Sequence, residues 1–226
     1  MKYYYNNVPG DGLCRNNLIY TSLINDDATV FGLHYTTEGN YHKGQNQVVD
    51  PKLMQEKFER EMHYMHNMAY HFPHLVPEIL EVNVPERKIY LAIDGVDFWQ
   101  QSLDKNCTFD EVLPDWQEQM INIVQSHRNL GWYKYSMHPS SYFIVNGVLK
   151  SINYFFTYHQ NEPYISLKDV ESHIYSTRQD ELKKHTASMG VEWDKPQSFE
   201  TLNMLCWESF RINYPADFID KIKCIK

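Results

Sequence analysis

The chain has 226 residues, and its 42% share of hydrophobic residues is enough for a sizeable core, which argues against intrinsic disorder. A formal net charge of −8 at pH 7 argues against the phosphate backbone of a nucleic acid or an anionic membrane as the main partner. The cysteines lie far apart, the N-terminus lacks the apolar core of a signal peptide, and no apolar run is long enough to span a bilayer. We therefore expect a cytosolic protein with reduced thiols at Cys14, Cys107, Cys206 and Cys224.

The first part of the chain reads as strands. The β-branched and aromatic runs Asn17 to Ile24 and Ala28 to Tyr35 predict a hairpin, because Asn25-Asp26-Asp27 between them is good turn chemistry. A polar, glycine-containing loop is expected over Thr36 to Asn46. The lone GxG of Gly10-Asp11-Gly12 precedes the hairpin without a clear first strand, and is poor evidence for phosphate binding.

A helix is predicted over Pro51 to Tyr70, with Asp50 as its N-cap and proline at the first helical position. Pro73 and Pro77 end it, and two further strands are expected over Ile79 to Val84 and Lys88 to Ile93. The helix carries one apolar stripe at helical spacing, made of Met54, Phe58, Met62, Met65 and Ala69.

Asp94-Gly95 breaks the strand pattern, and the chain then becomes mainly helical. Pro114 to Leu130 has a broad apolar face, and Gly131 suits the position after a helix end. The two-residue turn Asn146-Gly147 predicts a hairpin between Tyr142 to Val145 and Val148 to Ile152. Further helices are expected within Leu167 to Ser188 and Phe199 to Tyr214.

This order of elements resembles the protein-kinase-like superfamily, which includes small-molecule kinases and lipopolysaccharide-kinase-like proteins. Arg87 to Leu103 resembles the fifth strand, the hinge and the following helix, and Met120 to Tyr133 resembles the long helix of the C-lobe. Pro139 resembles the catalytic-loop proline, and Asn146-Gly147 the turn before the metal-binding strand. The resemblance implies one α+β domain with a two-lobed kinase-like fold: a β-rich N-lobe with one helix over 1–93, and a mostly helical C-lobe over 94–226 with a hairpin near 142–153.

The same resemblance predicts a site that lacks its acidic residues. Lys134, Tyr135 and Ser136 replace the HRD triplet, Ser141 replaces the metal-binding asparagine, and Asn153 replaces the aspartate of DFG. His127-Arg128-Asn129 imitates HRD, but His127 falls on the apolar face of a helix and Pro139 would come too late, so we reject that register.

Four residues are predicted to line the cleft of such a fold as ligand-binding positions: His34, Glu61, Asp94 and Gly95. His34 is the expected counterpart of the phosphate-pairing lysine, and Glu61 that of its glutamate partner. Each acidic residue also has a plainer interpretation. Glu61 could be an exposed carboxylate on a charged helix face, and Asp94 and Asp97 could serve turn and helix-capping chemistry.

The hypothesis is a catalytically degenerate, pseudokinase-like binding or regulatory module with a protein partner. Magnesium prefers carboxylate oxygens, so no metal or other cofactor is expected, and any ATP would bind without magnesium. The alternatives are a divergent active small-molecule or protein kinase and a structural or assembly protein that reuses the fold. The acidic, Tyr- and Asn-rich composition is similar to that of viral accessory proteins. His63, His66, His71 and His74 are open to two interpretations, a metal cluster or a polar helix flank.

Overall fold

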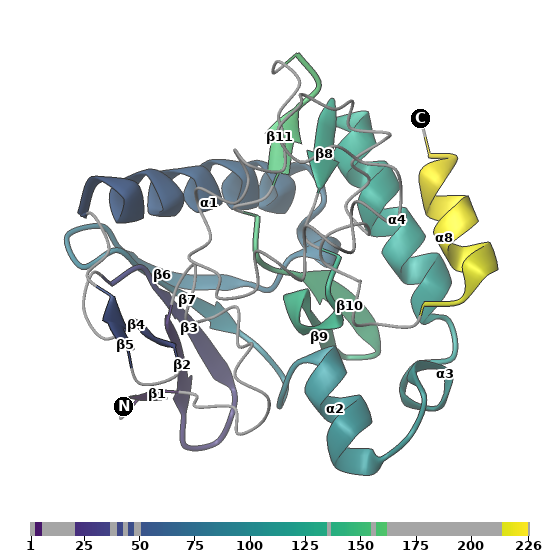
Figure 1. Cartoon of the computed structure of the whole chain (residues 1–226), viewed down its shortest axis with the longest axis horizontal. Coiled ribbons are helices and arrows are strands. Elements are labelled where there is room, and N and C mark those ends of the chain that lie inside the picture. Colours follow the sequence, from purple (N-terminus) through teal and green to yellow (C-terminus); the bar gives the residue numbers. More distant parts are fainter. Residues whose placement is uncertain are drawn as a thin grey trace.

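The computed structural model describes residues 3–5, 21–36, 40–42, 45–47, 51–134, 137–154, 157–161 and 214–225. Over these residues the protein is a mixed α and β structure built around an antiparallel sheet (Figure 1). This agrees with the α+β class expected from the sequence.

The main sheet has five strands in the order β1-β2-β3-β7-β6, and every neighbouring pair is antiparallel. The predicted hairpin is formed by β2 (Thr21–Asn25) and β3 (Val30–His34). Its turn is held by the buried Asn25, whose Oδ1 accepts hydrogen bonds from the backbone N–H groups of Thr29 and Val30. The strand β1 (Tyr3–Tyr5), which pairs with β2, was not expected.

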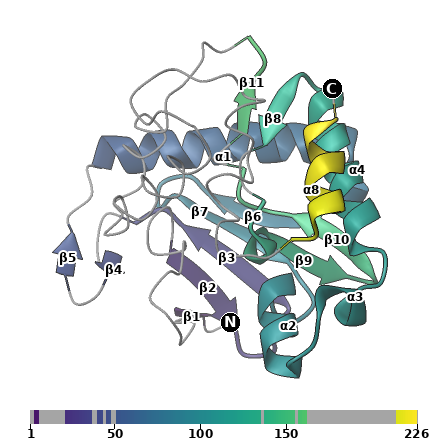
Figure 2. The same ribbon diagram turned by 45° about the vertical axis from the view of Figure 1, so that its right-hand side comes forward.

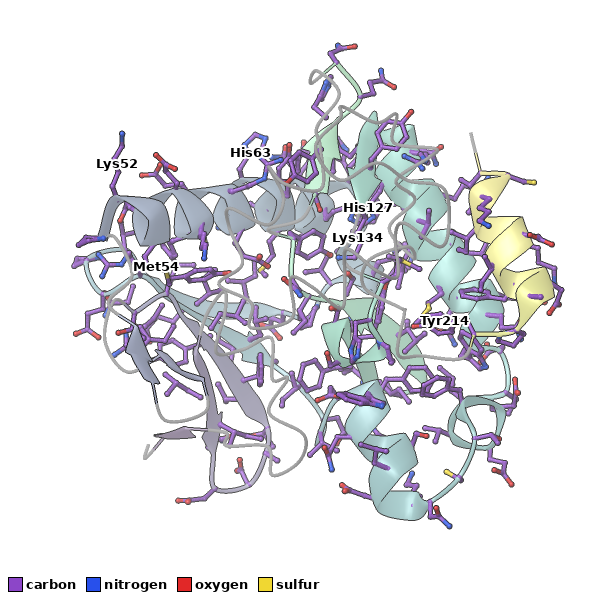
Figure 3. The ribbon with its side chains drawn as sticks, viewed as in Figure 1. Lys52, Met54, His63, His127, Lys134 and Tyr214 are labelled. Carbon is purple, nitrogen blue, oxygen red and sulfur yellow. The ribbon has the colours of Figure 1, made fainter. Side chains whose placement is uncertain are left out.

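The long helix α1 (Pro51–His71) runs across the sheet, as Figure 1 shows, and matches the predicted helix to within one residue. Met54, Phe58 and Met65 are buried, and Figure 3 shows Met54 on the side of the sheet and Lys52 and His63 on the opposite side.

The expectation of a loop before α1 was wrong for part of it, because β4 (Asn40–His42) and β5 (Gln45–Gln47) form a two-stranded hairpin. These short polar strands pair through the backbone and have no apolar alternation by which a sequence pattern could reveal them.

After the 3-10 turn η2 (Pro73–Leu75), the strands β6 (Ile79–Asn83) and β7 (Lys88–Ala92) complete the sheet as predicted. Three helices follow: α2 (Phe98–Lys105), α3 (Phe109–Val112) and α4 (Trp116–Asn129). The short α3 was not expected, although Thr108 and Glu111 form a capping box at its start.

The predicted hairpin around Asn146-Gly147 consists of β9 (Tyr142–Val145) and β10 (Val148–Ser151), preceded by the 3-10 turn η3 (Pro139–Ser141). The strand β8 (Trp132–Lys134) pairs with β11 (Thr157–His159), which the sequence did not reveal. Figure 2 shows the terminal helix α8 (Ala216–Lys223) beside α4. The helices expected within 167–188 and 199–214 lie outside the described residues, apart from position 214.

One continuous hydrophobic cluster joins the sheet, α1, the β9–β10 hairpin and the later helices. The ring of Phe31 on β3 contacts that of Phe143 on β9, with centroids 5.0 Å apart. On the helical side, the indole of Trp116 is buried against Phe98, Phe109, Tyr214 and Phe218. The cluster includes residues on both sides of position 93, and the division into two lobes expected there stays a prediction. Among the described helices, none is both long and apolar enough to cross a membrane.

Candidate functional site

Two of the predicted counterpart residues meet in the interior. Ser141 ends η3 and Asn153 follows β10, and each is 1% exposed. The Nδ2 of Asn153 donates a hydrogen bond to the Oγ of Ser141 at 3.2 Å, and the two segments are also joined by the backbone bond from Ile152 N to Ser141 O. The pair is therefore neutral, and its members bind each other. The third counterpart, Ser136, lies outside the described residues.

Asn153 has an unusual backbone conformation with φ of 65°, in the left-handed region that asparagine tolerates better than most residues. Its Oδ1 is buried and has no hydrogen-bond partner among the described residues. An amide oxygen and a hydroxyl supply neutral donor atoms only, a poor set for a hard divalent cation.

The segment around Asn153 is held by a lysine from β8. Lys134 is fully buried, and its Nζ donates hydrogen bonds to the carbonyl oxygens of Ile152 at 3.2 Å and Asn153 at 3.1 Å. The same ammonium lies 4.8 Å from the ring centroid of Tyr154, within cation–π range. The sequence placed Lys134 at the start of the degenerate catalytic loop but did not foresee this role, because contacts with carbonyls about twenty residues away leave no local pattern.

Glu61 binds the next residue of that segment. This carboxylate on α1 is fully buried, and its Oε1 accepts a hydrogen bond from the backbone N–H of Tyr154 at 2.7 Å. The interpretation of Glu61 as an exposed surface carboxylate is therefore wrong. The structure brings Glu61, Ser141 and Asn153 into one buried neighbourhood contributed by α1, η3 and the segment after β10.

His34 differs from the lysine it was expected to replace. Burial lowers its pKa to about 4, with Lys88 and Arg87 adding to the effect, so the imidazole is neutral at pH 7. Protonation consequently does not restore the missing positive charge. Side chains alternate between the faces of a strand, and Phe31 and Leu33, unlike His34, belong to the core cluster. His34 thus points to the other face of the sheet, near the β6–β7 turn.

A stacked pair of rings packs next to the Asn153 segment. His127 of α4 and Tyr154 have centroids 5.6 Å apart and an interplanar angle of 15°. Nδ1 of His127 lies 2.8 Å from the carbonyl oxygen of Ile123, and since burial lowers the pKa of His127 to about 3, the neutral ring donates this hydrogen bond. Figure 3 shows His127 and Lys134 close together in the interior. The complete burial of His127 confirms that it lies on the apolar face of its helix, while the rejection of an HRD role for it stays a prediction.

The remaining candidates, Asp94, Gly95 and Asp97, lie in the connection between β7 and α2. Asp94 is exposed, and Gly95 has φ of 81° and donates its N–H to the carbonyl oxygen of Ala28. Asp97 is the N-cap of α2, because its Oδ1 accepts from the N–H of Gln100 at 3.0 Å, so the capping interpretation is confirmed for this residue. Burial raises the pKa of Asp97 to about 6. A ligand contact at Asp94 or Gly95 stays a prediction.

The four histidines near the end of α1, His63, His66, His71 and His74, are all exposed. Figure 3 shows His63 on the outward side of the helix. Within the described parts of the chain, His, Cys, Asp and Glu side chains form no group of three or more that could hold a metal ion.

Comparison with known proteins adds no assignment, since no protein-family model and no curated protein matches this sequence.

Proposed function

We propose that this protein is a catalytically degenerate, kinase-like module that binds a protein partner and does not transfer phosphate. The order of elements supports the kinase-like part of the proposal: strands, one long helix, two strands, a connector, a long helix, a loop and a hairpin. The convergence of Glu61, Ser141 and Asn153, which were assigned to one site from the resemblance, supports it further.

The observation that carries the proposal is the hydrogen bond between Asn153 and Ser141. In a protein kinase, the residues at the two corresponding positions hold magnesium on ATP. Here they are a buried amide and a buried hydroxyl, and the two are hydrogen-bonded to each other. Glu61, a carboxylate in the same neighbourhood, accepts a hydrogen bond from the Tyr154 N–H.

The consequence for catalysis is large. A positioned general base contributes roughly 10²–10⁴ in rate, and metal charge stabilisation contributes roughly several kcal/mol. Loss of both is expected to remove on the order of 10⁴-fold or more of phosphoryl-transfer activity, even though such effects are not additive. ATP, where it binds, is expected to do so without magnesium.

Two measurements on the purified chain test the proposal. The first is radiolabelled phosphate transfer and ATP hydrolysis, where we expect no rate above that of a boiled sample. The second is the melting temperature with ATP in EDTA and with ATP and magnesium, because a ligand that binds the folded state raises it. We expect the two ATP conditions to give the same melting temperature.

The double variant Ser141→Asn with Asn153→Asp provides the comparison, because it restores the residue types that hold magnesium in kinases. In this variant, ATP should raise the melting temperature more with magnesium than without, unlike in the native chain. The control Asn146→Asp, which changes an exposed asparagine of similar φ in the hairpin turn, should show no such magnesium dependence. A magnesium-dependent shift of the native chain, together with phosphate transfer, would favour the divergent-kinase alternative and refute the proposal.

A further inference from the structure

A groove lies along β6, at the edge of the main sheet. It has a volume of about 500 Å³ and runs between the last turns of α1, the segment that follows it, and the edge strand β6. Figure 1 shows α1 above β6 and β7. Much of the lining of the groove is apolar and includes Ala69, Pro73, Val76, Pro77, Ile79 and Val82.

Three exposed apolar side chains lie on or next to the segments that form this groove. Within the described residues, the exposed large hydrophobic side chains are Tyr70 (83% exposed), Val84 (57%), Leu103 (54%) and Leu80 (49%). Leu80 lines the groove, Tyr70 lies one helical turn after the lining residue His66, and Val84 directly follows β6. Isolated exposed hydrophobic residues are ordinary, but a cluster at the border of an apolar groove is typical of an interaction site.

The backbone of β6 offers a second means of recognition. In the described sheet β6 pairs with β7 only, so one row of its N–H and C=O groups faces outward. Such an edge can pair with an extended peptide, which gains affinity from main-chain hydrogen bonds and specificity from alternate side chains. The register shift between Ile79 and Glu81 turns the extra residue, Leu80, outward at the start of this edge.

The charges at the groove indicate which peptide fits. Glu78 and Glu81 line the groove and are exposed, and within the part of the chain that the structure describes neither forms an ion pair. The nearby Lys150 donates its Nζ to the carbonyl oxygen of Val76 at 3.3 Å, so its amine is directed at the backbone. A partner segment with basic side chains would complement the two carboxylates.

We propose that β6 and this groove bind an extended, basic segment of another protein, in which apolar side chains alternate with lysine or arginine. A second copy of this chain fits less well. In a symmetric antiparallel pairing centred on Glu81 the two carboxylates would stand opposite each other, and the net charge of −8 opposes self-association. The proposal rests on the groove, the edge of β6 and the two exposed carboxylates, and does not depend on the proposed loss of catalysis.

The test uses the full chain and a fluorescent heptapeptide of alternating lysine and valine, with binding followed by fluorescence anisotropy at physiological salt. Two peptide controls isolate the contributions: one replaces valine by serine, and the other carries N-methyl groups on alternate amides. We expect each control peptide to bind at least tenfold more weakly than the lysine–valine peptide.

The protein variants are Leu80→Asp and the double variant Glu78→Lys with Glu81→Lys, all at exposed positions that should not disturb folding. Each should weaken binding at least tenfold, whereas Leu103→Asp, an equally exposed leucine on α2, should change it less than twofold. The proposal is overturned if the lysine–valine peptide does not bind, if the N-methylated peptide binds equally well, or if Leu103→Asp weakens binding as much as Leu80→Asp. It is also overturned if light scattering shows a native dimer that Leu80→Asp converts to a monomer.

Discussion

Replacing Lys134 by methionine tests whether one buried ammonium holds the Asn153 segment in place. The Nζ of Lys134 donates to two carbonyl oxygens, those of Ile152 and Asn153, and the side chain is fully buried. Hydrogen bonds to charged groups contribute roughly 1.5–3 kcal/mol each, so the gross loss is roughly 3–6 kcal/mol. Methionine offsets part of this loss because it no longer buries a charge. We expect the free energy of unfolding to fall by about 2–4 kcal/mol.

The assay is urea unfolding at pH 7, supported by a thermal melt. A chain of this size loses about 2–4 °C in melting temperature per kcal/mol, so Lys134→Met should melt roughly 4–16 °C lower than the native protein. The matched control is Lys150→Met on strand β10, which pairs with β9. Lys150 is half-buried and donates to a single carbonyl at 3.3 Å, so its replacement should cost about 1 kcal/mol or less.

A second readout separates loss of the charge from general damage. Lys134 contributes to the low pKa of His127, after burial, so Lys134→Met should raise that pKa in an NMR titration while Lys150→Met leaves it unchanged. If Lys134→Met destabilises the protein no more than Lys150→Met does, the reasoning that this ammonium holds the segment is refuted.

Three further predictions concern the neighbouring packing. The pKa of His127 is about 3 in the folded protein against 6.5 unperturbed. Below pH 6.5 the unfolded chain therefore binds a proton that the folded chain does not, and the free energy of unfolding decreases as the pH is lowered. Between pH 7 and pH 5 the native protein should lose about 2 kcal/mol more unfolding free energy than His127→Gln does, as measured by urea unfolding at both pH values. Equal losses for the two proteins would contradict this. Phe31→Ala should cost about 3–5 kcal/mol in urea unfolding, since Phe31 is 4% exposed and packs on Phe143, and a cost below 1 kcal/mol would show that the ring contact is unimportant. Gln119→Ala should lower the free energy of unfolding by about 1–2 kcal/mol, because the Gln119 amide accepts a hydrogen bond from Leu149 N and donates one to Gly147 O. The Leu149 N–H should also exchange faster with solvent, and an unchanged exchange rate would count against the prediction.

The sequence by itself determined most of the local structure. Pro51 and the apolar stripe that begins at Met54 predicted α1, and Asn146-Gly147 predicted the β9–β10 hairpin, because helix starts and two-residue turns depend on residues close together in the chain. The neutral character of the Ser141–Asn153 pair was also readable, since neither residue carries a charge in any fold. Where the local signal was weak, as in β1, β4, β5 and the short β11, the prediction failed.

Only the tertiary structure decided which of these residues meet. The hydrogen bond from Tyr154 N to Glu61 spans 93 positions, and the lysine that holds Asn153 comes from a strand 19 positions earlier. The sheet face to which His34 points depends on the register of β3 relative to the core, and a shift of one residue reverses it. Such contacts arise when separate elements pack together, and since burial and hydrogen-bond partners are properties of that packing, a linear pattern carries no record of them.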